Sequence, residues 1–238
     1  MKSIDIYKVL ERAYLDGIIN EVLLKIDNGI VEVTAIDMSN TNFLHVSEKI
    51  DCKDTCELGL QNIGLLKRYI SDSKEAAEFK VTKKRAKIVR ENGNQISVSL
   101  LEPYEVPTKV SGKSPETMIK KLKDSTTVSA QIHENTVDEL LYYTKIIDAV
   151  SIVFVADEGS VIAKTPESNN ERFKLNIGRF RGKTSATTEV PKQHISAVFK
   201  VLEFQNDEKP ILSFSNDGPV IIEQNDMNMW AISPLASE

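Results

Sequence analysis

The sequence predicts an α+β protein built from two similar domains, each with two helices packed on antiparallel sheet. The order helix, strands, helix, strands occurs twice along the 238 residues, and equivalent features lie about 130 residues apart. Each helical segment carries a single apolar stripe, which is typical of a helix that covers one face of a sheet. The chain length also suits two domains of about 100 residues each.

The clearest repeated feature is a tight hairpin near the start of each half. Asp27-Asn28-Gly29 precedes the strand-like run 30–33, and Asp157-Glu158-Gly159 precedes the run 160–163. Glycine supplies the positive φ that a tight hairpin turn requires. The two turns therefore predict equivalent hairpins in the two halves.

Four amphipathic segments predict the helices. Apolar residues recur at helical spacing over 6–14 and 137–147, before the hairpins, and over 63–70 and 195–202, after them. A strand pair follows each later helix, around Asn92-Gly93-Asn94 and around Asp217-Gly218-Pro219. Such stripes can arise by chance in any α/β protein, but the shared order favours a true repeat.

A connector separates the two halves. Residues 102–125 contain several prolines, Gly112 and mainly polar side chains, which are typical of a link between domains. We therefore predict one domain over 1–101, a connector over 102–125 and a second domain over 126–238. A short helix that begins at Pro115, with Ser114 as its cap, is predicted inside the connector.

Composition excludes several classes of protein. A net charge of −5 argues against a generally basic nucleic-acid-binding surface, although it allows one basic face. No apolar run approaches the roughly 20 residues of a membrane span, and the start of the chain lacks a signal core. We therefore expect a cytoplasmic protein, with the nucleus as the alternative. Cys52 and Cys56 are expected to be reduced thiols, and without a second cysteine pair or a nearby histidine cluster they are a weak metal signal. No metal and no cofactor are predicted.

Two segments carry a resemblance to a known family. Ser215-Asn216-Asp217-Gly218-Pro219 with the apolar run 220–222 and Glu223, followed by Trp230-Ala231-Ile232-Ser233-Pro234, resembles the C-terminal motif of the PCNA family of DNA sliding clamps. Residues 35–39 are similar to the Met-Asp-Ser-Ser stretch of its first domain. The resemblance includes the shorter phage and viral members of this family. It implies a closed homotrimeric ring that encircles duplex DNA. It also implies the replicative polymerase, other replication proteins and a clamp loader as partners.

The same resemblance places the four helices on the inside of the ring, facing the DNA. Cationic side chains bind phosphates without reading the base sequence, which suits a protein that must slide. The helices offer the following candidates for this role: Lys8, Arg12, Lys67, Arg68, Lys145 and Lys200. The same polar faces also carry Asp5, Glu11 and Asp138. The alternative interpretation is therefore that these cations are ordinary surface residues with no role in DNA binding.

The resemblance also indicates a groove that binds short partner peptides. The matching positions are Thr41, Phe43, Pro219, Ala231, Ser233 and Pro234, with Val110 or Met118 of the connector closing the groove. Each of these residues fits an ordinary core position equally well. Ring closure is expected to use the edge strands 95–101 and 172–178, because pairing them head to tail removes exposed sheet edges.

Three further interpretations concern a basic stretch, enzymatic activity and the ring. The basic stretch 79–90 is interpreted as a solvated strand face that limits aggregation, with DNA or polymerase contact as the alternatives. An enzyme is disfavoured, because the three histidines lie far apart and no catalytic motif occurs. The remaining alternative to the ring is a monomeric clamp-like processivity factor that binds DNA on one basic face.

Overall fold

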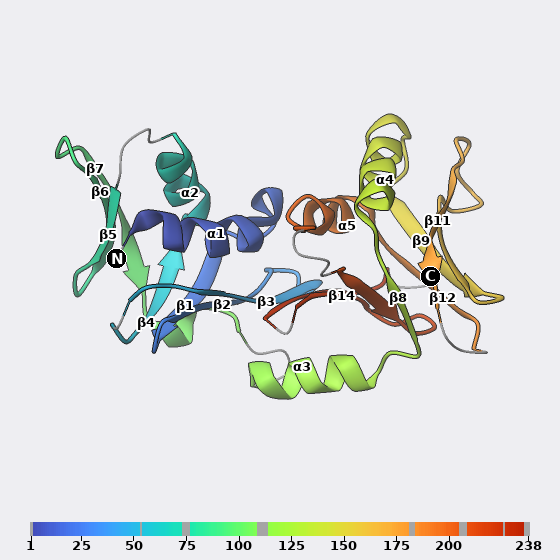
Figure 1. Cartoon of the computed structure of the whole chain (residues 1–238), viewed down its shortest axis with the longest axis horizontal. Helices are drawn as coiled ribbons and strands as arrows, with labels where there is room; N and C mark the ends of the chain where they lie inside the picture. The colour runs from blue at the N-terminus through green and yellow to red at the C-terminus, as the bar shows by residue number, and fades with distance from the viewer. Residues whose placement is uncertain are drawn as a thin grey trace. The chain divides into compact units, whose positions relative to one another are not determined.

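The computed structural model describes residues 2–52, 54–72, 77–108, 114–180, 184–204, 209–225 and 227–235. The chain forms two compact units, Met1–Pro115 (unit 1) and Glu116–Glu238 (unit 2) (Figure 1). The boundary between them lies inside the segment 102–125 that the sequence assigns to the connector. Among the described residues, no helix has the length and apolar character that crossing a membrane requires.

Unit 1 contains two α-helices and a single antiparallel sheet. Its elements are α1 (Ser3–Tyr14), η1 (Leu15–Gly17), β1 (Glu21–Asp27), β2 (Ile30–Ile36), β3 (Asn42–Lys49), β4 (Cys56–Gln61), α2 (Ile63–Ser71), β5 (Ala77–Val81), β6 (Arg85–Arg90), β7 (Gln95–Leu101) and η2 (Pro103–Glu105). The sheet order is β5-β6-β7-β4-β1-β2-β3. The strands β4 and β7 pair only at Gly59↔Leu101 and Leu60↔Leu100, so the sheet opens on either side of this short contact.

The two helices of unit 1 pack together on one face of its sheet (Figure 1). The buried stripe of α1 consists of Ile6, Val9, Leu10 and Ala13, at the spacing that the sequence predicts. Alternate residues of β1, such as Val22 and Leu24, are buried in turn. Each fully buried aliphatic side chain contributes about 1.5–3 kcal/mol to folding, so this stripe holds α1 on the sheet.

Unit 2 repeats the helix and strand order of unit 1. Its elements are α3 (Pro115–Asp124, whose first residue closes unit 1), β8 (Val128–Gln131), α4 (Glu134–Ile146), β9 (Ser151–Asp157), β10 (Ser160–Lys164), β11 (Lys174–Arg179), β12 (Ala186–Pro191), α5 (Lys192–Phe199), β13 (Ile211–Phe214), β14 (Val220–Gln224) and β15 (Asn228–Ile232). The strands form one group in the order β11-β10-β9-β12 and another in the order β15-β14-β13-β8. The helices α4 and α5 contact each other, and α5 also contacts β9, β12 and β15 (Figure 1).

The two predicted hairpins have the same backbone geometry. Asn28 and Gly29 have φ values of 48° and 78°, and Glu158 and Gly159 have φ values of 48° and 80°. The pairs Asp27↔Ile30 and Asp157↔Ser160 close the two turns. Positive φ at both central residues is the conformation that matches the twist of a two-residue hairpin, so these turns confirm the repeat.

Several predicted details differ from the structure. Three strands follow α2 and three follow α5, where the sequence predicted a pair in each place. The strand β7 has the predicted bounds Gln95–Leu101 but does not lie at a sheet edge, because β4 pairs with its C-terminal end. The other predicted edge strand, 172–178, is β11, which does end its sheet and spans Lys174–Arg179.

The predicted helical stripes are also wrong at a few positions. Leu65 is 46% exposed and Ile146 is 54% exposed, although both fall on the apolar stripe by spacing. The helix α5 ends at Phe199, so 201 and 202 lie beyond it. Within the connector, α3 begins at Pro115 as predicted and buries Met118.

Candidate functional site

The helices of unit 1 carry four of the predicted DNA-facing cations, and the structure gives them different environments. Lys8 and Arg68 are exposed, Lys67 is half-buried and Arg12 is buried. Lys8 and Arg12 lie one turn apart on α1, whereas Lys67 and Arg68 are neighbours on α2. Exposed side chains can reach a phosphate directly, so Lys8 and Arg68 fit that role best.

Arg12 and Lys8 share one carboxylate on the neighbouring strand β3. The Arg12 Nη1 lies 2.8 Å from Glu48 Oε2, and the Lys8 Nζ lies 3.2 Å from Glu48 Oε1. Burial opposes the ionisation of Glu48, but the hydrogen bonds from Arg12 and Lys8 outweigh it and lower the pKa of this carboxyl. The side chain of Arg12 is only 8% exposed, so in this conformation it ties α1 to the sheet and does not present its charge to solvent.

Lys67 sits where the two helices of unit 1 meet. Its ammonium lies 5.2 Å from the centre of the Tyr14 ring and 3.9 Å from Glu11 Oε1. The Tyr14 ring can lie this close to α2 because residue 64 is glycine: a Cβ there would be 2.5 Å from Tyr14 Cε2. The cation is thereby held at the helix surface by contacts with α1.

The helices of unit 2 are less basic than those of unit 1. Lys145, in the last turn of α4, and Lys200, which caps α5, are both exposed as the sequence predicts. The exposed surface of α4 also carries Glu134, Asp138 and Glu139. These acids offset the charge of Lys145, so the attraction of this helix for phosphate is weak.

The predicted partner residues of unit 1 follow a turn organised by Asp37. The Asp37 carboxylate accepts hydrogen bonds from Ser39 Oγ, from the backbone N–H and Oγ1 of Thr41 and from the backbone N–H and Nδ2 of Asn42, at 2.6 to 3.1 Å. Burial of the carboxyl raises its pKa, but these hydrogen bonds outweigh burial and lower the pKa overall. Thr41 is half-buried and Phe43, on β3, is 5% exposed.

The same turn exposes a residue that sequence reasoning did not single out. Met38 lies at its tip and is 99% exposed, between Asp37 and Ser39 of the hydrogen-bonded turn. A fully exposed thioether on an ordered turn is available to a partner, since methionine adapts to irregular apolar surfaces. Its place in the motif 35–39 was the available signal, but periodicity alone cannot reveal exposure at a turn.

The predicted partner residues of unit 2 lie at the adjoining ends of β14 and β15. The pair Val220↔Ile232 places Pro219 and Ser233 opposite each other just beyond the ladder. The backbone on both sides is fixed by β12, because Thr188 Oγ1 donates to Gly218 O at 2.6 Å and Leu235 N donates to Glu189 O at 2.8 Å. Ala231 is buried, whereas Pro219, Ser233 and Pro234 are half-buried. Val110, the first predicted cover of the groove, lies outside the described residues.

Chemistry-bearing side chains are dispersed in the described part of the chain. No group of His, Cys, Asp and Glu there could hold a metal ion. Cys52 and Cys56 are free thiols, and burial, together with the nearby Asp54 and Cys52, raises the pKa of Cys56. A raised pKa disfavours the reactive thiolate, so this cysteine is a poor nucleophile at neutral pH.

Solved structures of sliding clamps match the chain over its full length. PCNA from Thermococcus kodakaraensis matches with a TM-score of 0.70 at 12% identity, covering 98% of this chain and 97% of that chain. A. fulgidus PCNA with the C-terminal region of FEN-1 bound has a TM-score of 0.73 at 12% identity, covering 100% and 98%. The DNA polymerase sliding clamp of Pseudomonas aeruginosa has a TM-score of 0.71 at 13% identity, covering 100% of this chain but 66% of that chain.

Sequence comparisons find no match among protein-family models or among curated proteins. The likeness is therefore one of three-dimensional structure, and it extends through both units and the segment that joins them. The chain has the DNA sliding-clamp fold.

Proposed function

We propose that this chain is a DNA sliding clamp that encircles duplex DNA and tethers the replicative polymerase. The observation that carries the proposal is the agreement in fold, along the whole chain, with clamps from several organisms. In this role the protein is a processivity factor and not an enzyme, and it uses no cofactor. Its proposed setting is the replication fork of a phage or virus in the host cytoplasm.

Sequence-independent phosphate contact is the proposed role of Lys8, Lys67, Arg68, Lys145 and Lys200. Each of these cations lies on or next to one of the four helices, and all but Lys67 are exposed. Arg12 is proposed to stabilise the same surface, because it holds Glu48, the carboxylate that the exposed Lys8 also contacts. A few long, mobile cations hold DNA weakly enough to permit sliding.

Three copies, joined head to tail, are the proposed ring. The strand β11 ends its sheet, and β8 approaches it only at its C-terminal end, near the bridge Ala130↔Phe180, so the rest of this edge is available for pairing. Among the described strands, β7 pairs with β6 on one side and with β4 on the other, but with β4 only at its C-terminal end. The second side of its N-terminal half therefore has no partner strand in the described part of the chain. Pairing of β7 with β11 of the next copy would cover both edges and close the ring.

Short peptides of the polymerase and of other replication proteins, together with a clamp loader, are the proposed partners. Thr41 and Phe43 of unit 1, and Pro219, Ala231, Ser233 and Pro234 of unit 2, are the residues proposed to bind such peptides. The A. fulgidus PCNA structure, which contains a bound segment of FEN-1, gives this mode of binding a precedent in the same fold. Apolar side chains with a polar rim suit short peptides with apolar anchors.

One observation favours a second candidate, a monomeric processivity factor that grips DNA on one face. The acids Glu134, Asp138 and Glu139 on α4 leave the helices of unit 1 as the more basic pair. A monomer would need only that one basic face.

Native mass and topology on DNA test the two candidates. Light scattering across a range of concentrations should give about three times 26.6 kDa for the ring. Protein loaded onto nicked circular DNA should stay bound in high salt and should leave when a restriction enzyme linearises the circle. A monomer at every concentration, released from circular and linear DNA at the same salt, would refute the ring and support the one-faced factor.

A further inference from the structure

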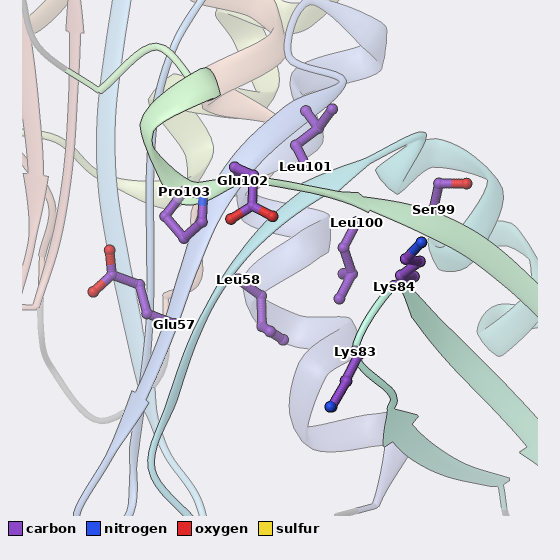
Figure 2. A pocket seen from close by; sticks show the side chains of 9 residues that line it. All are labelled: Glu57, Leu58, Lys83, Lys84, Ser99, Leu100, Leu101, Glu102 and Pro103. Atoms are coloured by element: carbon purple, nitrogen blue, oxygen red, sulfur yellow. The ribbon is translucent and has the colours of Figure 1, made fainter.

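A pocket of about 410 Å³ opens in unit 1 where the sheet divides. The strands β4 and β7 separate beyond Gly59↔Leu101, and the turn between β5 and β6 faces the gap. Figure 2 shows Leu58 and Leu100 in the middle of the pocket, Lys83 and Lys84 on one side, and Glu57 and Pro103 on the other. We call this cavity the Lys83–Leu100 pocket.

Hydrogen bonds to the backbone fix the cationic side of the pocket. The backbone N–H of Leu100 donates to Lys84 O at 3.0 Å, and Thr82 N donates to Arg85 O at 2.9 Å. The turn that carries Lys83 and Lys84 is thus attached to β7, and Thr82 Oγ1, which donates to Arg85 O at 3.0 Å, adds a side-chain contact within it. Both lysines are exposed, and neither forms an ion pair with another residue of the described part of the chain.

The acidic groups of the pocket are already engaged elsewhere or lie on the opposite side. The Glu102 carboxylate accepts a hydrogen bond from the backbone N–H of Glu105 at the start of η2. Glu57 faces Lys25 across the β1–β4 ladder, on the far side from Lys83. The pocket therefore has a cationic side with Lys83 and Lys84 and an acidic side with Glu57, and between them lie Leu58 and Leu100 with the Glu102 carboxylate next to Leu58.

This distribution favours a peptide over a nucleic acid. Duplex DNA presents a row of phosphates, for which Glu57 would be repulsive and the apolar side chains would have no use. Unpaired bases bind by stacking on aromatic rings, and none of the side chains lining the pocket is aromatic. An apolar side chain can fill a cavity of this size, while a carboxylate beside it can reach the lysines.

We propose that the Lys83–Leu100 pocket binds a short segment of a partner protein that carries an apolar side chain next to Asp or Glu. This site is separate from the residues proposed above for partner peptides. It would give the basic stretch 79–90 a role beyond limiting aggregation, since Lys83 and Lys84 select the acidic residue and Leu58 and Leu100 receive its apolar neighbour.

The test uses fluorescein-labelled nonapeptides and the full chain. One set has Leu or Phe at the centre, preceded by three Asp or Glu residues; a second set replaces the acids by Asn or Gln; a third replaces the central residue by Ser. Fluorescence anisotropy should show that the first set binds at least about tenfold more tightly than the other two, because charge and apolar burial contribute together.

Two variants and one matched control locate the binding. The double variant K83E/K84E and the pocket-filling variant Ser99→Tyr should each weaken binding of the first set by at least about tenfold. Ser99 lines the pocket and is exposed on β7, so a larger side chain there does not disturb the core. The control K120E/K121E makes the same charge change at two exposed lysines of α3 and should bind as the unmodified chain does.

Three results would overturn the proposal. The first is no binding of the first set at a protein concentration of about 100 µM. The second is equal binding of the acidic and neutral sets. The third is an equal loss of binding in the control and in the pocket variants. A DNA duplex of about 30 base pairs, or three helical turns, serves as the second probe. If K83E/K84E loses duplex binding while peptide binding is absent, the cations form a DNA surface and the pocket has no peptide role.

Discussion

Arg12 on α1 donates a hydrogen bond to Glu48 on β3, with 2.8 Å between Arg12 Nη1 and Glu48 Oε2. The two residues are 36 positions apart in sequence, and the contact joins the first helix to the sheet of unit 1. Both side chains are largely removed from solvent, at 8% and 23% exposure. An ion pair in this setting is costly to break, because Glu48 would keep only its contact with the exposed Lys8.

Replacing Arg12 by methionine should therefore lower the free energy of unfolding by about 2 kcal/mol. Methionine keeps the apolar stem, so the loss reports mainly the removal of the Arg12–Glu48 ion pair, with Lys8 left as the partner of Glu48. Urea denaturation followed by circular dichroism measures the change. The matched variant Lys8→Met removes the exposed partner of the same carboxylate and should cost less than about 1 kcal/mol. Equal losses in the two variants would show that the buried position of Arg12 has no special role.

Stability should fall in mild acid. Folding lowers the pKa of Asp37 below its ordinary value of 3.8 and that of Glu48 below 4.5. The stabilisation is thus complete above the ordinary values and is lost as the pH falls through the lower, folded-state values. Urea midpoints measured from pH 7 down to pH 3 should decrease, and the decrease should be smaller in Asp37→Asn. Asp51→Asn, at an exposed position, serves as the control and should keep the full pH dependence.

Gly64→Ala should destabilise unit 1 by about 1–3 kcal/mol, because the new methyl group would overlap the Tyr14 ring. A double-mutant cycle with Tyr14→Ala isolates this cause. The Gly64→Ala cost should largely disappear once the ring is gone, giving a coupling energy above about 1 kcal/mol. Additive losses in the urea experiment would mean that Gly64 matters for a reason other than the close approach of Tyr14.

Arg68→Ala should weaken binding to duplex DNA and reduce the salt dependence of that binding. Arg68 is exposed on α2, and the loss of one phosphate contact lowers the slope of log K against log salt by about 1. The measurement is a titration of labelled duplex at several salt concentrations. Lys120→Ala, at an exposed position on α3, should leave the slope unchanged. An unchanged slope for Arg68→Ala would remove α2 from the proposed DNA surface.

The repeated architecture was predictable because its signals are local. The hairpin turns at Asn28-Gly29 and Glu158-Gly159 need positive φ, and the sequence provides glycine at the same place in each. The stripe of α1 is buried as its spacing predicts. The start of α3 at Pro115 was likewise predictable from the sequence. Proline has a fixed φ and no N–H, so it suits the first turn of a helix.

The candidate site was less predictable, because exposure depends on residues distant in the sequence. Lys8 and Arg12 are equivalent by spacing on α1, yet one is exposed and the other is buried against Glu48. Ile146 and Leu65 fit their apolar stripes but remain exposed, and the spacing alone does not distinguish them from the buried members. The Lys83–Leu100 pocket depends on where β4 and β7 separate, and no local pattern encodes that point.

The sequence by itself determined the two-unit α+β architecture, the tight turns and the helical stripes, since backbone preferences and hydrophobic periodicity act over a few residues. Only the tertiary structure decided which cations reach solvent, which carboxylate each of them meets and where the sheet opens into a pocket. Those outcomes depend on contacts between strands and helices that are dozens of residues apart, where packing and desolvation outweigh local preference.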